Sequence, residues 1–233
     1  MTVESGAEVT VQVGVSANAN AADIEEIFRL FDECYESANP TYLERSLAML
    51  RNVATARQED RLVGFCLGEM RNLDLPGLGA QSVALSGLCC VSPVRRRQGL
   101  SERLVSCALA HEAQLVGERF LAAARMAHPA SSRRATRVNS VVPTHGRRPT
   151  PWQQEVGSAV ARAYGSVEFD PEHFVIRGSG TPIGYPRIDI DAEVVAAEAD
   201  LFEHVDRGRG DVLLTIAWSP TAPAGWYGGN SEG

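Results

Sequence analysis

The sequence predicts an α/β (α+β) fold in one large domain, and three observations support this prediction. The apolar pattern changes repeatedly between the two-residue period of a strand and the 3.6-residue period of a helix. The length, 233 residues, suits one large domain with additions. Residues 91–101 join an apolar run to a helical pattern through a basic turn with a glycine. This arrangement presents backbone N–H groups to a phosphate.

The first part of the chain predicts three strands and two helices. Residues 8–15 alternate in the period of a half-buried strand, whereas apolar side chains from Ile24 to Tyr35 recur on one helical face. Asn39-Pro40 ends that pattern, and proline suits the first turn of the next helix. The expected strands are 8–15, 53–57 and 62–70, with a hairpin turn at 58–61, and the expected helices are 23–37 and 40–50.

The middle of the chain contains the basic turn. A segment rich in Leu, Pro and Gly, residues 72–81, is expected to be a loop. A fourth strand (82–91), the turn, a helix (101–116) and a short buried strand (120–124) then follow in order.

The last part of the chain predicts alternating helices and strands after a long basic segment. Residues 125–150 are too many for an ordinary connection and are expected to be functional or mobile. Pro151 suits the first position of a helix. The expected elements are a helix over 152–164, a strand over 174–177, a helix over 191–205 and a strand over 212–218, followed by a disordered tail over 219–233.

The turn resembles the acyl-CoA signature of the GNAT superfamily of N-acyltransferases, V-x-P-x-x-R-x-x-G-x-G/A. The matching residues are Val91, Pro93, Arg96 and Gly99, with Ser101 in the place of the usual Gly or Ala and Leu104 three residues on. The predicted elements from residue 8 to 124 also follow this family's order. The resemblance implies a mixed, mostly antiparallel sheet, splayed between the fourth and fifth strands and flanked by helices. It implies one domain, 1–218, with a basic insertion at about 125–150.

The resemblance implies acetyl-CoA or another acyl-CoA as co-substrate. It implies direct transfer of a short acyl group to a primary amine of a small metabolite. The residues implied to hold the diphosphate through their amides are Arg96, Arg97, Gln98, Gly99, Leu100 and Ser101. An amide near the end of the fourth strand, at Cys89, Cys90 or Val91, would meet the thioester carbonyl.

The resemblance also implies where a general acid lies. Tyr164, at the end of the predicted helix 152–164, is the candidate acid for the leaving thiolate, and a core tyrosine is the alternative. The general base is less clear, because the fourth strand contains no acid or histidine. Glu69 is the nearest carboxylate, and His128 and His145 flank the basic segment. No residues have the spacing of a metal site.

The content and position of the basic residues restrict the reactions and ligands that the chain can have. All 22 basic residues are Arg, so Schiff-base chemistry on lysine is excluded. Residues 119–154 hold seven Arg and no acid, which suits either a solvated basic loop or a surface for an anionic acceptor. Two alternatives stay open. One is a tRNA-dependent aminoacyltransferase, which the acidic remainder of the chain argues against. The other is a non-catalytic module that binds acyl-CoA.

The sequence also suggests where the protein works. It shows no secretory signal and no apolar run of the length a membrane span needs. Its five cysteines lack paired spacing, which is typical of free thiols in a reducing compartment. We therefore expect a cytoplasmic protein without a membrane partner. A homodimer is common in the family that the chain resembles.

Overall fold

The structure is a computed structural model and describes residues 8–110, 119–132, 141–188 and 199–227. The chain divides into two compact units, each described here by itself. Unit 1 takes residues 1–69, 87–113 and 184–188, and unit 2 takes 70–86, 114–183 and 189–233.

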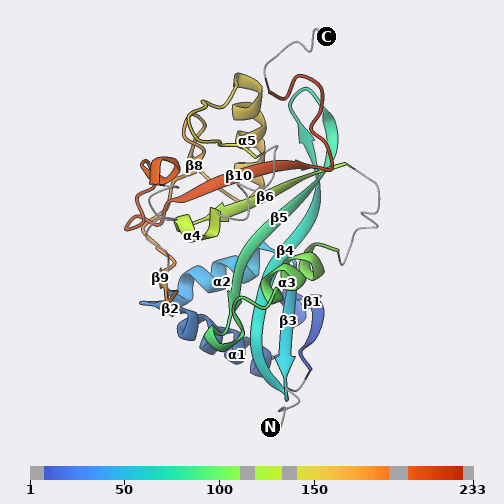
Figure 1. Ribbon diagram of the computed structural model, residues 1–233, viewed down its shortest axis with the longest axis vertical. Coiled ribbons are helices and arrows are strands. Elements are labelled where there is room, and N and C mark those ends of the chain that lie inside the picture. Colours follow the sequence, from blue (N-terminus) through green and yellow to red (C-terminus); the bar gives the residue numbers. More distant parts are fainter. Residues whose placement is uncertain (1–7, 111–118, 133–140, 189–198, 228–233) are drawn as a thin grey trace, which may run out of the picture. The chain divides into compact units, whose positions relative to one another are not determined.

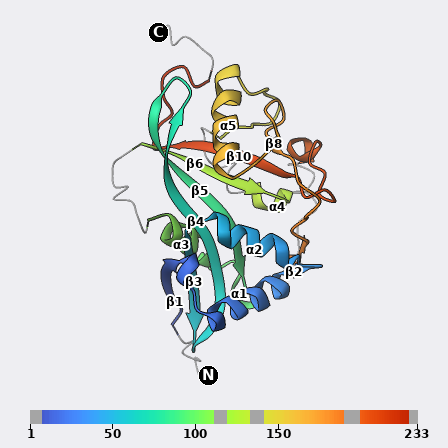
Figure 2. The same cartoon turned by 180° about the vertical axis from the view of Figure 1, so that it is seen from behind.

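Unit 1 contains antiparallel strands with helices on both sides. Its elements are the strands β1 (Thr10–Val15) and β3 (Asn52–Gln58), parts of β4 (Arg61–Leu75) and β5 (Gly79–Val91), the helices α1 (Ala21–Cys34), α2 (Pro40–Met49) and α3 (Leu100–Ala110), and the 3-10 turns Ser16–Asn18 and Pro93–Arg95. Strand β3 pairs antiparallel with β1 and with β4. The short strands β2 (Tyr35–Glu36) and β9 (Tyr185–Pro186) form a separate pair. Helices α1 and α2 lie on one side of these strands and α3 on the other (Figures 1 and 2).

Two glycines of β4 allow α3 to approach the sheet closely. A Cβ at Gly64 would meet the Leu104 side chain at 2.8 Å, and one at Gly68 would meet the Ala108 side chain at 3.1 Å. The side-chain amide of Asn52 donates to the carbonyl of Ala108 at 3.0 Å. Because these contacts fix α3 against β3 and β4, they also fix the turn that precedes the helix.

Unit 2 is built on β6 (Phe120–Met126) and β10 (Val212–Ser219), which pair antiparallel. Its other elements are β7 (Phe169–Asp170), β8 (Val175–Ile176), α4 (Pro129–Ser132), α5 (Pro151–Ala163) and the 3-10 turn Ala199–Phe202, together with the remaining parts of β4 and β5. Residues 83–86 of β5 pair parallel with residues 121–124 of β6, and β5 itself continues to Val91. Helix α5 lies beside β10 (Figures 1 and 2).

The sheet confirms the predicted fold class. The strands are hydrogen-bonded in the order β1-β3-β4-β5-β6-β10-β8-β7. The described pairings are antiparallel except for the parallel pair β5–β6, which joins the fourth and fifth long strands. This parallel pair fits the predicted splay, because its register ends at Ser86 and Ala124 while β5 continues. The prediction of a single domain stays a prediction.

The start of α5 confirms the prediction that Pro151 occupies the first helical position. Thr150 is the N-cap, and its hydroxyl accepts from the Gln153 amide at 3.2 Å. The Gln153 side chain in turn accepts from the Thr150 amide at 2.9 Å, which completes a capping box. These bonds determine where the helix starts, and therefore where its last turn places Tyr164.

Two predicted boundaries are wrong. The segment 72–81 is mostly strand, because β4 continues to Leu75 and β5 starts at Gly79, which leaves only a short turn between them. The predicted helix over 191–205 lies partly outside the described residues. Its described end is a 3-10 turn, Ala199–Phe202, and residues 203–205 are not helical.

The predicted disordered tail is also wrong for residues 219–227. Trp226 is fully buried and packs edge-to-face on Trp152 and Trp218, with ring centroids 5.3 and 5.8 Å away. The Gln153 side chain donates to the Trp226 carbonyl at 2.7 Å. One large aromatic side chain thus anchors a segment whose many Gly and Pro residues indicated disorder. Residues 228–233 lie outside the described residues.

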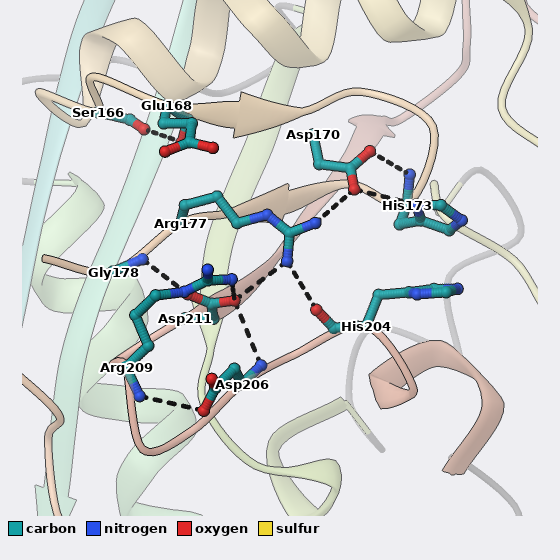
Figure 3. Close-up of polar contacts among 10 residues, drawn as sticks. All are labelled: Ser166, Glu168, Asp170, His173, Arg177, Gly178, His204, Asp206, Arg209 and Asp211. Carbon is teal, nitrogen blue, oxygen red and sulfur yellow. Dashed lines mark hydrogen bonds and ion pairs between the residues drawn. The ribbon is translucent and has the colours of Figure 1, made fainter. Parts of the chain in front are cut away.

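A charged cluster holds the loops at one end of unit 2 together. The buried carboxylate of Asp211 accepts from Arg209 at 2.6 and 2.8 Å, from Arg177 at 3.1 Å and from the Gly178 amide at 2.8 Å. Arg177 also donates to Asp170 at 2.6 Å, so its guanidinium joins two carboxylates (Figure 3). The cluster links residues 170–178 to the loop before β10.

Candidate functional site

The basic turn of unit 1 lies between the end of β5 and the start of α3, as predicted. Ser92, the first residue after β5, is buried. Its amide donates to the Val63 carbonyl at 2.9 Å, and its hydroxyl donates to Glu33 at 2.8 Å. The 3-10 turn Pro93–Arg95 follows and α3 begins at Leu100. These two hydrogen bonds, one to the backbone of β4 and one to a side chain of α1, therefore fix the end of β5 where the turn begins.

The backbone of this turn presents unused N–H groups. Arg97 and Gly99 have positive φ angles, 61° and 73°, and glycine adopts such an angle at little cost. The Arg96 amide donates to the Pro93 carbonyl at 3.4 Å. In contrast, the amides from Arg97 to Leu100 donate to no acceptor in the part of the chain that the structure describes. Successive free amides at a helix N-terminus form an anion-binding concavity.

A side chain at residue 99 would find open space. A Cβ there would meet only the Glu102 carboxylate, at 3.8 Å. The glycine is therefore explained by its backbone angle and not by protein packing. Its bare backbone also leaves the concavity open to a ligand.

The three arginines of the turn have different environments. Arg95 donates to the side chain of Gln58. Arg96 donates to the Val91 carbonyl at 3.1 Å and also to the Arg187 carbonyl, so its guanidinium binds the β9 segment within unit 1. Within the described residues, Arg97 forms no ion pair. Arg96 is thus occupied by two backbone carbonyls of unit 1, whereas Arg97 has no ion-pair partner in the described part of the chain.

The end of β5 holds two cysteines in unlike surroundings. Cys89 is half-buried, whereas Cys90 is 2% exposed. Burial, followed by its contact with Cys34, raises the pKa of Cys90 well above the ordinary thiol value. The hydrogen bond with Cys90 lowers the pKa of Cys34 in turn. A thiol held protonated is a poor nucleophile, so Cys90 does not suit an acyl-enzyme intermediate.

Tyr164 lies in unit 2, at the C-cap of α5, and is 2% exposed. Its hydroxyl lies 2.8 Å from the Ser86 carbonyl and 3.0 Å from the Ala123 carbonyl. Those two residues belong to the last pairs of the parallel β5–β6 register. The candidate acid is therefore held at the point where the two strands stop pairing.

The candidate bases are in different environments. In unit 1, Glu69 accepts from the Arg51 amide at 3.2 Å. In unit 2, His128 is half-buried, and burial together with the charge of Arg207 lowers its pKa. His145 forms an ion pair with Asp200 at 2.6 Å. A lowered pKa keeps His128 neutral at pH 7, which is the state that a base requires.

The described residues lack a side-chain grouping of the kind that holds a metal ion. Across residues 8–110, 119–132, 141–188 and 199–227, no three His, Cys, Asp or Glu side chains are grouped to hold an ion. In that same part of the chain, no helix is long and apolar enough to cross a membrane.

Comparisons with known proteins give likenesses at low identity. No family model matches the chain, and no curated protein matches it. Among solved structures, a GNAT-family N-acetyltransferase (YhbS) from Escherichia coli in complex with CoA is 17% identical, with a TM-score of 0.39 over 57% of this chain and 71% of that one. A structure named a putative acetyltransferase of the GNAT family, from Desulfovibrio desulfuricans, is 15% identical, with a TM-score of 0.41 over 56% of this chain and 84% of that one. An aminoglycoside N-acetyltransferase, AAC(6')-Iy, in complex with CoA is 18% identical, with a TM-score of 0.35 over 46% and 70%.

At these identities and TM-scores the likeness carries no conclusion about activity. The element order and the sheet are properties of this chain itself. Among the described strands, the order of the sheet, the parallel pair β5–β6 and the turn between β5 and α3 agree with the mixed, mostly antiparallel sheet expected from the sequence.

Proposed function

We propose that the chain is a GNAT-type N-acyltransferase that moves an acetyl or other short acyl group from acyl-CoA to a primary amine of a small metabolite. One observation carries this proposal. Within the residues that the structure describes, the turn before α3 presents the free amides of residues 97–100 together with the unpaired guanidinium of Arg97. Free amides and one cation are suited to a diphosphate, the anionic group of coenzyme A.

The reaction is a direct transfer. The neutral amine attacks the thioester carbonyl, a C–N bond forms, and the C–S bond breaks to release a thiolate. A base removes the proton of the ammonium, and an acid protonates the thiolate. Tyr164 is the proposed acid, because its hydroxyl is held where the β5–β6 pairing ends. Burial raises the pKa of Cys90, which argues against this thiol as the nucleophile of a covalent route.

Acetyl-CoA binding and thiol release test the proposal. We expect calorimetry to show acetyl-CoA binding tighter than acetyl-pantetheine binding, which lacks the diphosphate, by about 100-fold or more. We also expect release of free CoA thiol with a panel of primary amines. Equal affinity for both compounds would contradict the role of the turn. Binding without thiol release from any amine would indicate a non-catalytic acyl-CoA module.

Substituting phenylalanine for Tyr164 tests the proposed acid. We expect kcat to fall by about 100-fold or more, with little change in the Kd for acetyl-CoA, because a general acid acts in the transition state. Loss of the hydroxyl should also cost about 1 kcal/mol of stability. If only the melting temperature falls and kcat is unchanged, the hydroxyl is a structural tie between the strands. Rate measurements at saturating acetyl-CoA, beside a melting curve, separate the two outcomes.

The pH dependence of kcat/KM identifies the base. We expect the activity to fall as the pH decreases through the pKa of His128, and burial places that pKa below the ordinary value of 6.5. The variant His128→Gln should lose most of the activity, and the activity that remains should no longer fall as the pH decreases. Glu69→Gln is the matched variant, and we expect its kcat/KM to fall at acidic pH as it does in the wild type. If Glu69→Gln removes the fall of kcat/KM at acidic pH and His128→Gln does not, Glu69 is the base.

A further inference from the structure

Arg125, on β6 in unit 2, is a charged side chain that has no hydrogen-bond acceptor or ion-pair partner among the described residues. It is half-buried, and its Nε is inaccessible to solvent with no hydrogen-bond acceptor. Within the described part of the chain, its guanidinium forms no hydrogen bond or ion pair with any residue. Arginine stays protonated in proteins, so the charge remains even where the surroundings disfavour it.

Other half-buried arginines of unit 2 do have acceptors. Arg71 donates to the Ala163 carbonyl at 2.6 Å. Arg177 donates to Asp170 at 2.6 Å and to Asp211 at 3.1 Å. Burying an unpaired charge costs free energy, and carbonyl or carboxylate oxygens satisfy the guanidinium groups of Arg71 and Arg177. Within the described residues, Arg125 therefore lacks the hydrogen-bond acceptors that Arg71 and Arg177 have.

The guanidinium of Arg125 is held in one place. It lies over the ring of Tyr164, 4.8 Å from the ring centroid, in a cation–π contact. Arg125 directly follows Ala124, whose pairing with Ser86 is the last of the parallel register. The cation thus lies over the ring that carries the hydroxyl we propose as the acid. Because strand and ring fix the side chain, binding an anion here would cost little additional ordering.

We propose that Arg125 binds a carboxylate of a substrate during acyl transfer. This inference rests on the proposed function. A planar guanidinium matches a carboxylate with two parallel N–H···O bonds, and one cation balances its single charge, whereas a phosphate dianion would need a second. The carboxylate belongs either to the acceptor, as in an amino acid, or to the acyl group, as in the thioester of a dicarboxylic acid.

Matched pairs of substrates distinguish the two sources. The acceptor pair is β-alanine and propylamine, and the donor pair is succinyl-CoA and butyryl-CoA. We expect the wild type to prefer the carboxylate-bearing member of one pair by about 10- to 100-fold in kcat/KM. The pair that shows the preference identifies the source. No preference in either pair would overturn the inference.

The variant Arg125→Gln should lose that preference while it keeps activity on the neutral member of the pair. Arg162→Gln, which removes an exposed arginine of α5 in the same unit, is the matched control and should keep the preference. The substitution removes no hydrogen bond or ion pair within the described residues and loses only the contact with the Tyr164 ring, so we expect the melting temperature of Arg125→Gln to stay close to that of the wild type. A preference that survives in Arg125→Gln would overturn the inference.

Binding measured without turnover separates this inference from the proposed function. We expect β-alanine or succinyl-CoA to raise the melting temperature of the wild type more than its neutral counterpart does, and Arg125→Gln to lose this difference. If no thiol is released but the carboxylate-bearing compound still raises the melting temperature more than the neutral one, the proposed function fails and the carboxylate site stands. If thiol is released but the two compounds raise the melting temperature equally, the carboxylate site is wrong and the proposed function stands.

Discussion

Replacing Asp211 with alanine is expected to lower the free energy of unfolding by about 3 kcal/mol. The carboxylate is fully buried and accepts from Arg177, Arg209 and the amides of Gly178 and Asp206. Without it, these donors lose their acceptor. Arg177 should dominate the cost, because its side chain is 20% exposed and has less access to water than that of Arg209 at 45%.

The same cluster predicts how stability depends on pH. Burial acts to raise the pKa of Asp211, but the hydrogen bonds from Arg209, Gly178 and Arg177 overcome it and hold the pKa well below the ordinary range. A lowered folded-state pKa stabilises the protein above the unfolded value of about 3.9, and this contribution is lost as the pH falls through the folded pKa. The stability difference between wild type and Asp211→Ala should therefore be constant near neutral pH and shrink in acid.

Urea unfolding followed by tryptophan fluorescence measures this effect. The tryptophans Trp152, Trp218 and Trp226 all belong to unit 2, as does Asp211, so the signal reports the relevant unit. Asp74→Ala is the matched control, because Asp74 is an exposed carboxylate of the same unit and its loss should change stability by about 0.5 kcal/mol or less. Equal losses in the two variants would show that the Asp211 cluster is not stabilising.

Local sequence patterns predicted what depends on neighbours in the chain. Thr150-Pro151 predicted the start of α5, because capping and the fixed φ of proline act within one helical turn. The basic turn after β5 was predicted in the same way, from an apolar run, a glycine and a helical period. These signals predicted the turn between β5 and α3 and the start of α5, and the mixed, mostly antiparallel sheet was implied by the family resemblance.

Features that depend on distant residues were not predictable from such patterns. Arg96 is held by the carbonyl of Arg187, and no local pattern relates residues so far apart. No local pattern indicated that Asp211 is buried, because its partner Arg177 lies 34 residues earlier in the chain. Arg125 appeared only as one of several basic residues. Its lack of a partner becomes visible only when the surrounding side chains are placed.

The second large effect is expected at the turn before α3. Substituting proline for Gly99 should weaken acetyl-CoA binding by about 100-fold or more, because it removes one free amide and cannot adopt the φ of +73°. Arg97→Gln should weaken binding by about 10-fold, since it removes one unpaired cation without changing the backbone. Calorimetric titration with acetyl-CoA measures both effects.

Two controls show whether the loss comes from the diphosphate contact. Arg103→Gln removes one charge from the same helix, α3, where the arginine donates to the Val9 carbonyl, and it should leave the affinity nearly unchanged. Acetyl-pantetheine has no diphosphate, so its affinity should be the same for wild type and Gly99→Pro. If Gly99→Pro weakens both ligands equally, the substitution disrupts the unit rather than the anion site. If it weakens neither, the amides of this turn do not hold the cofactor, and the acyltransferase assignment loses the observation that carries it.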